Sequence, residues 1–200
     1  MRSAVALFSS ILLLQVPALA LSDTVVDDLA HHPMVAEFPS GGQLDLHIRS
    51  AEIHIVGSDE DKVVVRVEGK RASESTDMKA SFERTDRFGK LRIRGGPSND
   101  VKITILVPKK SDLSIHIFAG DVEVKDVIGN KDVDLSAGDL TIGVGNVTDY
   151  AHVEASVTSG SIEGGPFGQS PGGLFRSFEK FGSGKYKLVA HVGAGDLTLK

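Results

Sequence analysis

The segment Ser136–Asn146, SAGDLTIGVGN, decides the fold because its first half recurs along the chain. A small residue, a glycine and a polar residue stand before an alternating apolar stretch, and the same phrase returns as FAGDVEV, TSGSIEG and GAGDLTL. A fifth copy, LHIRSAEIHI, has Ala51 in place of the glycine. Repetition of one short unit indicates a repeat architecture.

The copies align on this glycine position, which we call the corner. The residues three and five before it and two and four after it make twenty positions, of which nineteen are apolar and one is Gly164. With 40% hydrophobic residues in the chain, composition alone would give about eight. The nineteen are Leu46, Ile48, Ile53, Ile55, Ile115, Ile117, Val122, Val124, Val133, Leu135, Leu140, Ile142, Ala155, Val157, Ile162, Ala190, Val192, Leu197 and Leu199.

This repeat predicts an all-β fold, a single-stranded β-helix or β-solenoid with stacked coils. The spacing of 18 and then 22 residues between Gly120, Gly138 and Gly160 is enough for two strands and two turns. Stacked coils place equivalent residues ~4.8 Å apart, so the apolar positions form continuous columns. The glycine turns the corner between two strand faces, where the backbone needs a positive φ that side chains penalise.

The first twenty residues, 1–20, match a secretory signal peptide. Arg2 is followed by an apolar run over Ala4–Val16 and a small-x-small cleavage site at Ala18–Ala20. The alternative is a retained membrane anchor. It is disfavoured because the apolar run is shorter than the ~20 residues that span a bilayer.

Beyond residue 20, the chain is predicted to consist of a short N-terminal segment followed by one domain. Residues 21–34 are expected to be a mobile segment in which Ser22–His32 forms a few helical turns. Residues 35–200 form the β-solenoid domain. Residues 35–108 are its irregular N-terminal strands, β-sandwich-like or a β-roll, and residues 109–200 are its repeat coils.

An insertion at 165–183 separates the last copy from the others. Apolar residues at three- and four-residue spacing over Gly173–Gly182 predict a short helical end cap that covers the open end of the stack. The alternative is that this aromatic segment docks a partner or a membrane interface. The residues concerned are Phe167, Phe175, Phe178 and Phe181, with Arg176 and Lys180 nearby.

Composition excludes several classes of protein. The net charge of −5 argues against nucleic-acid binding, which needs clustered Lys and Arg. The absence of cysteine excludes disulfides and an acylated lipoprotein cysteine. No GxxxxGK[ST], GxGxxG after a strand, HExxH or GxSxG motif is present, which weakens the common enzyme interpretations.

The chain from Val35 to Lys200 resembles a known group. The run FPSGGQLDLHIRSAEIHIVGSDEDKVVVRVEG, followed by ITILVP, AGDVEV, SAGDLTI, SGSIEG and GAGDLTLK, is similar to the bacterial putative-adhesin domain of unknown function. The resemblance implies an exported or membrane-tethered β-solenoid, akin to autotransporter-type adhesin heads. It supplies no catalytic residues.

Polar residues that follow the corner glycine are the first candidate site. Asp121, Asp139 and Asp196 share this position with Ser161. A carboxylate ladder would hold a hard cation such as Ca²⁺. We favour caps on turn amides, because serine is a poor calcium ligand but caps as well as aspartate does.

Histidines are the second candidate. His47, His116 and His191 share the position four before the corner, on the face opposite the core. With units stacked in chain order, two units without histidine separate His116 from His191, which is too far for one ion with bonds of ~2.1 Å. We therefore expect these residues, and His31 and His32 near the N-terminus, to face solvent rather than bind metal.

A third candidate is the segment DVIGNKDVD, which brings together Asp126, Lys131, Asp132 and Asp134. A β-helix lyase or hydrolase needs clustered carboxylates with Lys or Arg. Charged loops also keep solenoids soluble, and we prefer that role. The sequence thus predicts no catalytic, cofactor-binding or metal-binding residue.

The predicted function is that of a non-catalytic, exported adhesin-like or scaffold protein, periplasmic, secreted or at the cell surface. Its expected partner is a surface polysaccharide or an envelope protein, with no nucleic acid and no small-molecule cofactor. The alternative is a β-helix carbohydrate-active enzyme, a lyase or hydrolase. A third hypothesis is an envelope-stress or regulatory accessory domain that acts through a membrane partner.

Overall fold

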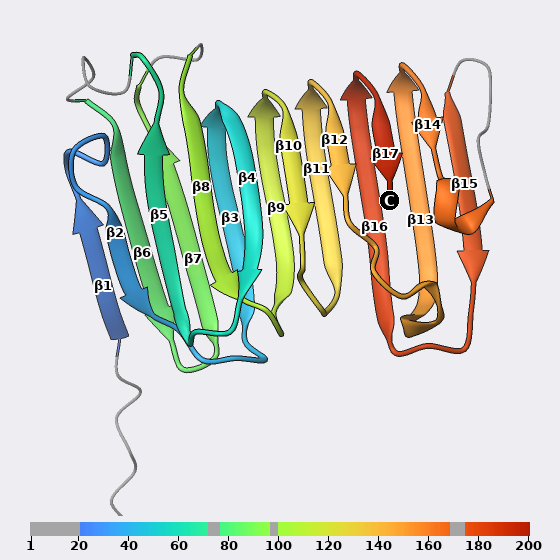
Figure 1. Ribbon diagram of the computed structural model, residues 1–200, viewed down its shortest axis with the longest axis horizontal. Helices are drawn as coiled ribbons and strands as arrows, with labels where there is room; N and C mark the ends of the chain where they lie inside the picture. The colour runs from blue at the N-terminus through green and yellow to red at the C-terminus, as the bar shows by residue number, and fades with distance from the viewer. Residues whose placement is uncertain (1–20, 72–76, 97–99, 169–174) are drawn as a thin grey trace, which may run out of the picture.

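The computed structural model describes residues 21–71, 77–96, 100–168 and 175–200. They form two mixed β-sheets that lie face to face, and neither sheet closes on itself (Figure 1). One contiguous apolar core fills the space between the sheets. None of the described helical turns has the length and hydropathy of a membrane-spanning helix.

Within the described ranges, seventeen strands make up the two sheets, which we call the nine-stranded and the eight-stranded sheet. In spatial order the nine-stranded sheet contains β1 (Leu21–Val26), β6 (Lys79–Thr85), β7 (Phe88–Arg94), β3 (Gln43–Ser50), β9 (Asp112–Ala119), β11 (Lys131–Ala137), β16 (Tyr186–Ala194), β13 (Tyr150–Ser159) and β15 (Arg176–Phe181). The eight-stranded sheet contains β14 (Ile162–Glu163), β17 (Leu197–Leu199), β12 (Leu140–Ile142), β10 (Val122–Lys125), β4 (Glu52–Ser58), β8 (Lys102–Pro108), β5 (Lys62–Glu68) and β2 (Met34–Glu37). Among the described residues, the short 3₁₀ helices η2 (Val147–Asp149) and η3 (Gly165–Phe167) precede β13 and follow β14.

Each copy of the repeat is a strand in the nine-stranded sheet, a corner, and a strand in the eight-stranded sheet. Neighbouring copies pair in parallel at the register that the sequence alignment predicts. In the nine-stranded sheet, one column runs through Ile48, Ile117, Leu135, Val192 and Val157. All nineteen apolar positions are buried, none more than 5% exposed. The predicted columns are therefore confirmed.

The corner glycines stack on one another and need their positive φ. Gly120, Gly138, Gly160 and Gly195 have φ values between +123° and +146°. A Cβ on Gly138 would collide with the carbonyl oxygen of Gly120, and a Cβ on Gly195 with that of Gly138. Glycine is required here both by conformation and by the close approach of the neighbouring backbone.

The order of the units in space differs from their order in the chain. The last unit, β16–β17, lies between β11–β12 and β13–β14 in both sheets (Figure 1). The connection from β14 back to β16 includes β15, which pairs antiparallel with β13 at the sheet edge. The prediction that units follow one another in chain order was wrong at this point.

The N-terminal strands, expected as an irregular β-sandwich-like or β-roll part, belong to the same two face-to-face sheets as the repeat. β7 pairs in parallel with β3, and β8 with β4, at the register of a further repeat unit. Leu91 and Ile93 lie beside Leu46 and Ile48. This sixth unit was missed because seven residues separate β7 from β8, where two separate β9 from β10.

Both helical predictions were wrong where the structure describes the residues. Leu21–Val26, assigned to a mobile segment with helical turns, is a strand paired with β6 over six residues. Arg176–Phe181, assigned to a helical cap, is the edge strand β15. Residues 173 and 174 of the predicted cap lie outside the described residues.

Candidate functional site

The outer face of the nine-stranded sheet carries rows of polar side chains. Strands β7, β3 and β9 lie side by side, and their registers place Arg92, His47 and His116 next to one another. Parallel strands lie ~4.8 Å apart, so like positions on neighbouring strands come within reach of each other.

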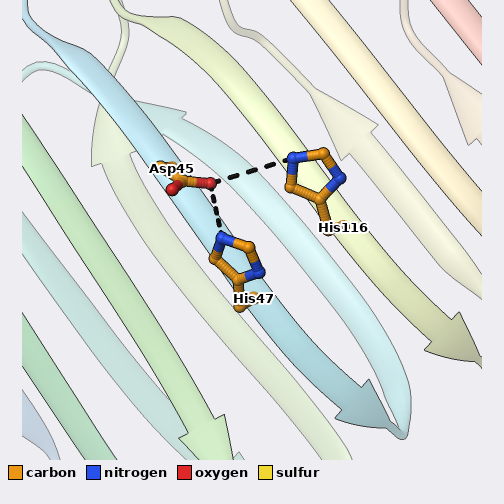
Figure 2. Close-up of side chains that lie close together, drawn as sticks. All are labelled: Asp45, His47 and His116. Atoms are coloured by element: carbon orange, nitrogen blue, oxygen red, sulfur yellow. Dashed lines mark ion pairs between the residues drawn. The ribbon is translucent and has the colours of Figure 1, made fainter.

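Asp45, His47 and His116 form a compact cluster on this face (Figure 2). Their ligand atoms lie within 4.8 Å of one another. Asp45 Oδ1 lies 2.9 Å from His47 Nε2 and 3.9 Å from His116 Nε2. The imidazole rings of His47 and His116 stack with centroids 5.0 Å apart. Among the described residues it is the one such grouping of three His, Cys, Asp or Glu side chains.

Two atoms of the cluster are shielded from solvent without a hydrogen bond. Asp45 Oδ1 and His47 Nε2 face each other, but the contact lacks hydrogen-bond geometry, and among the described residues neither atom makes a hydrogen bond with another group. The second oxygen of the carboxylate, Oδ2, lies 2.9 Å from Lys90 Nζ. Partial burial acts to raise the pKa of Asp45, but Lys90 and His47 outweigh it, so this pKa lies below its ordinary value.

An open groove of about 570 Å³ lies beside the cluster. Arg49, Arg92 and Arg94 contribute three guanidinium groups to its lining, and Phe118 contributes an aromatic ring that is 68% exposed. Arg92 pairs with Glu83 at 2.6 Å. In the described part of the chain, Arg49 and Arg94 have no ion-pair partner. The groove therefore offers unpaired positive charge in a protein whose net charge is −5.

The predicted histidine row is present, but its spacing was misjudged. His47 and His116 are neighbours, because β3 and β9 pair directly. One strand, β11, separates His116 from His191, where two units were expected. The ring of His191 contacts Ser156 Oγ at 2.9 Å, and His31 contacts Asp28 at 2.8 Å.

The three aspartates after the corner cap backbone amides, as the sequence analysis favoured, whereas the Ser161 hydroxyl is a donor. The Ser161 amide and hydroxyl donate to Asp196 Oδ1 at 2.7 and 2.6 Å. The Asp196 amide donates to Asp139 Oδ1 at 2.9 Å, and the Asp139 amide to Asp121 Oδ1 at 3.5 Å. Each cap thus reaches the neighbouring unit instead of its own turn. The hydroxyl and amide of Ser161 lower the pKa of Asp196.

The four residues of the proposed carboxylate cluster do not converge. Asp132 and Asp134 point outward from β11, while Lys131 is 1% exposed on the core side. Lys131 Nζ donates to Tyr150 Oη at 2.9 Å. Asp126 lies in the turn after β10 with φ +56°. Strand alternation explains the divergence, because successive side chains face opposite sides.

Of the four phenylalanines of the insertion, two are buried as the expected end cap requires, and two are exposed as the alternative of a docking surface requires. Phe167 and Phe178 are buried against the last units, as an end cap requires. Phe175 and Phe181 are 78% and 72% exposed. Lys180 Nζ lies over the ring of Phe167 and donates to its carbonyl oxygen at 3.2 Å.

Sequence reasoning missed Asp45, Lys90, the three groove arginines and Phe118. The alternation around Leu46 and Leu91 carried the signal, since Asp45 and Lys90 both precede these aligned positions. Placing β7 beside β3 in the alignment would have brought Asp45 and Lys90 together.

Comparison with known proteins bears on the fold alone. No family model and no curated protein matches the sequence. A solved structure of a putative cell adhesion protein from Clostridium sporogenes matches 84% of this chain and 98% of its own at 14% identity, with a TM-score of 0.51. A putative adhesin from Bacteroides fragilis matches 88% and 97% at 10% identity, with a TM-score of 0.26. The first likeness supports the adhesin-like fold that the resemblance implied.

Proposed function

We propose that this chain is a non-catalytic, exported adhesin-like or scaffold protein that binds an acidic polysaccharide along the outer face of its nine-stranded sheet. It acts in the periplasm, in the medium or at the cell surface. Its six parallel units form a β-solenoid-like stack, which serves as a rigid support for that face. The solved structure with a TM-score of 0.51 is of a putative cell adhesion protein, which agrees with this role.

The groove lined by Arg49, Arg94 and Phe118 is the observation that carries the proposal. Guanidinium groups bind carboxylates through paired N–H donors, and they remain charged at any physiological pH. An exposed phenylalanine ring offers a flat apolar surface, against which the apolar face of a sugar ring packs. Together they match a polymer of uronic acids.

The repeat itself favours a polymer over a small ligand. Neighbouring strands are spaced at ~4.8 Å, so polar side chains recur at regular intervals across the face. The row of His116 continues through Asp134, which also lines the groove, and then through His191 and Ser156. A long ligand can therefore contact several units at once, and weak contacts add up.

The arginines give the first testable prediction. The double substitution Arg49→Ala and Arg94→Ala is expected to weaken binding to polygalacturonate roughly 10-fold, because each exposed ion pair contributes up to ~1 kcal/mol. Binding of the natural chain should also weaken as salt rises. Both are measured by titration calorimetry with the chain from residue 21 onward.

The matched control is the double substitution Arg66→Ala and Lys102→Ala, which removes the same charge from the eight-stranded sheet. It should leave binding unchanged, and methyl-esterified polygalacturonate should not bind. Equal loss of polygalacturonate binding in both double variants would refute the groove as the binding site. Release of new reducing or unsaturated sugar ends during incubation would replace the non-catalytic role with the lyase or hydrolase alternative.

A further inference from the structure

The Asp45–His47–His116 cluster has the chemistry and the dimensions of a metal site. Two imidazole nitrogens and one carboxylate oxygen are common ligands of Zn²⁺ and related ions. The two contacts of Asp45 Oδ1 are 2.9 and 3.9 Å, and the third separation is at most 4.8 Å. A point equidistant from three such atoms lies within about 2.4 Å of each, close to Zn–N and Zn–O bonds of ~2.0–2.2 Å.

The unpartnered atoms point to the same conclusion. Asp45 Oδ1 and His47 Nε2 are shielded from solvent but make no hydrogen bond. Unpaired buried polar atoms cost free energy, and a bound cation would satisfy both lone pairs together. The ligands also lie on paired strands, so the backbone holds them in place (Figure 2).

We propose that Asp45, His47 and His116 bind one divalent transition-metal ion of the Zn²⁺ class. A fourth coordination position of the ion faces the solvent, since the side chains of His47 and His116 are 40% and 46% exposed. The site does not depend on the proposed binding of polysaccharide.

Charged side chains of both signs lie beside the site, with Lys90 and Arg92 among the cations and Asp134 among the anions. Lys90 contacts Oδ2 and leaves Oδ1 to the metal, so it orients the carboxylate in the way that outer partners orient metal ligands. Asp134 lies beside His116 on the next strand and offsets the charge of Lys90. Hard cations such as Ca²⁺ and Mg²⁺ prefer all-oxygen ligands, so the two imidazoles select against them.

The test is a titration of the full chain, freed of metal by chelation, with ZnCl₂. We expect one ion per chain by calorimetry, and a Co²⁺ complex with the visible absorption of a nitrogen- and oxygen-ligated ion. His116→Ala and Asp45→Asn should each weaken Zn²⁺ binding on the order of 100-fold. Circular dichroism of both variants should stay that of the natural chain, because His116 is exposed and Asp45→Asn keeps the shape.

Two controls separate this site from other histidines. His191→Ala removes a ring from the same row, and a His31→Ala, His32→Ala double variant removes the pair near the N-terminus. Both should bind Zn²⁺ as the natural chain does. The proposal is overturned if the natural chain does not bind Zn²⁺, if either control loses binding, or if His116→Ala retains it. The polysaccharide assay is run with chelator present, so failure of one proposal leaves the other intact.

Discussion

Gly138→Ala is expected to prevent the chain from folding or to destabilise it by at least ~4 kcal/mol. The new Cβ would collide with the carbonyl oxygen of Gly120, which belongs to the neighbouring unit. The residue would also have to keep φ at +123°, where a side chain adds strain of ~1–3 kcal/mol. Backbone cannot move aside here without breaking the parallel pairing on both sides.

The matched control is Gly145→Ala. Gly145 also has a positive φ, +69°, but a Cβ there would meet nothing within 4 Å. Its expected cost is ~1 kcal/mol, the conformational penalty alone. Urea unfolding followed by circular dichroism measures both variants. If the two glycines tolerated alanine equally, the close stacking of corners would be refuted.

Lys131→Met is expected to stabilise the chain by about 2 kcal/mol at pH 7. Burial lowers the pKa of Lys131 from 10.5 to about 8, against the opposing pull of Asp112. A shift of this size corresponds to a cost of about 3 kcal/mol while the unfolded lysine is charged, since one pKa unit is worth 1.36 kcal/mol. Methionine removes that cost but also the hydrogen bond to Tyr150.

The stabilisation should depend on pH in a defined direction. Between pH 8 and 10.5 the unfolded chain binds more protons at Lys131 than the folded chain does, so the natural protein gains stability as pH rises. The advantage of Lys131→Met therefore shrinks across this window and is gone above it. Burial also raises the pKa of Tyr150 to about 12, which lowers the stability of both proteins above pH 10.

Lys185→Met is the matched control for this effect. Lys185 also lies over a tyrosine ring, that of Tyr186, but it is exposed. Its substitution should change the free energy of unfolding by less than ~0.5 kcal/mol at every pH. A pH-independent difference between Lys131→Met and the natural chain would mean that Lys131 is not a buried charge.

The repeat was predictable because it is local. Alternation of apolar residues on both sides of a corner glycine predicts two strands, and Leu135 and Leu140 are buried on facing sheets as expected. The register followed as well, since a shift of one residue would turn every apolar side chain to solvent. These properties depend only on residues close together in the chain.

The order of the units was not predictable in the same way. All five aligned copies have equivalent apolar faces, so nothing local distinguishes β16 beside β13 from β16 beside β11, and the structure has both. The β7–β8 unit escaped notice because seven residues lie between its two strands in the sequence, where the other copies have fewer. The helical spacing of Phe178 and Phe181 competed with strand pairing at a sheet edge, and pairing prevailed.

The candidate sites divide in the same way, into local features that were predictable and contacts between distant units that were not. Caps by Asp139 and Asp196 were predictable because they belong to the repeat. The Asp45–His47–His116 cluster needs β3 and β9 as neighbours, although 69 residues separate the two histidines in the chain. Only knowledge of which units touch would have brought the three side chains together.

The position of β16–β17 bears on how this molecule can be made. A chain leaving the ribosome or a translocation channel delivers β11–β12 and β13–β14 before β16–β17, and the strands of the first two units pair with those of β16–β17 but not with each other. The pairing of these strands is therefore complete only once residues 186–200 have joined both sheets. Loss of residues 186–200 would not shorten the stack at one tip. It would leave β11–β12 and β13–β14 with unpaired strand edges, which could pair with another copy of the chain.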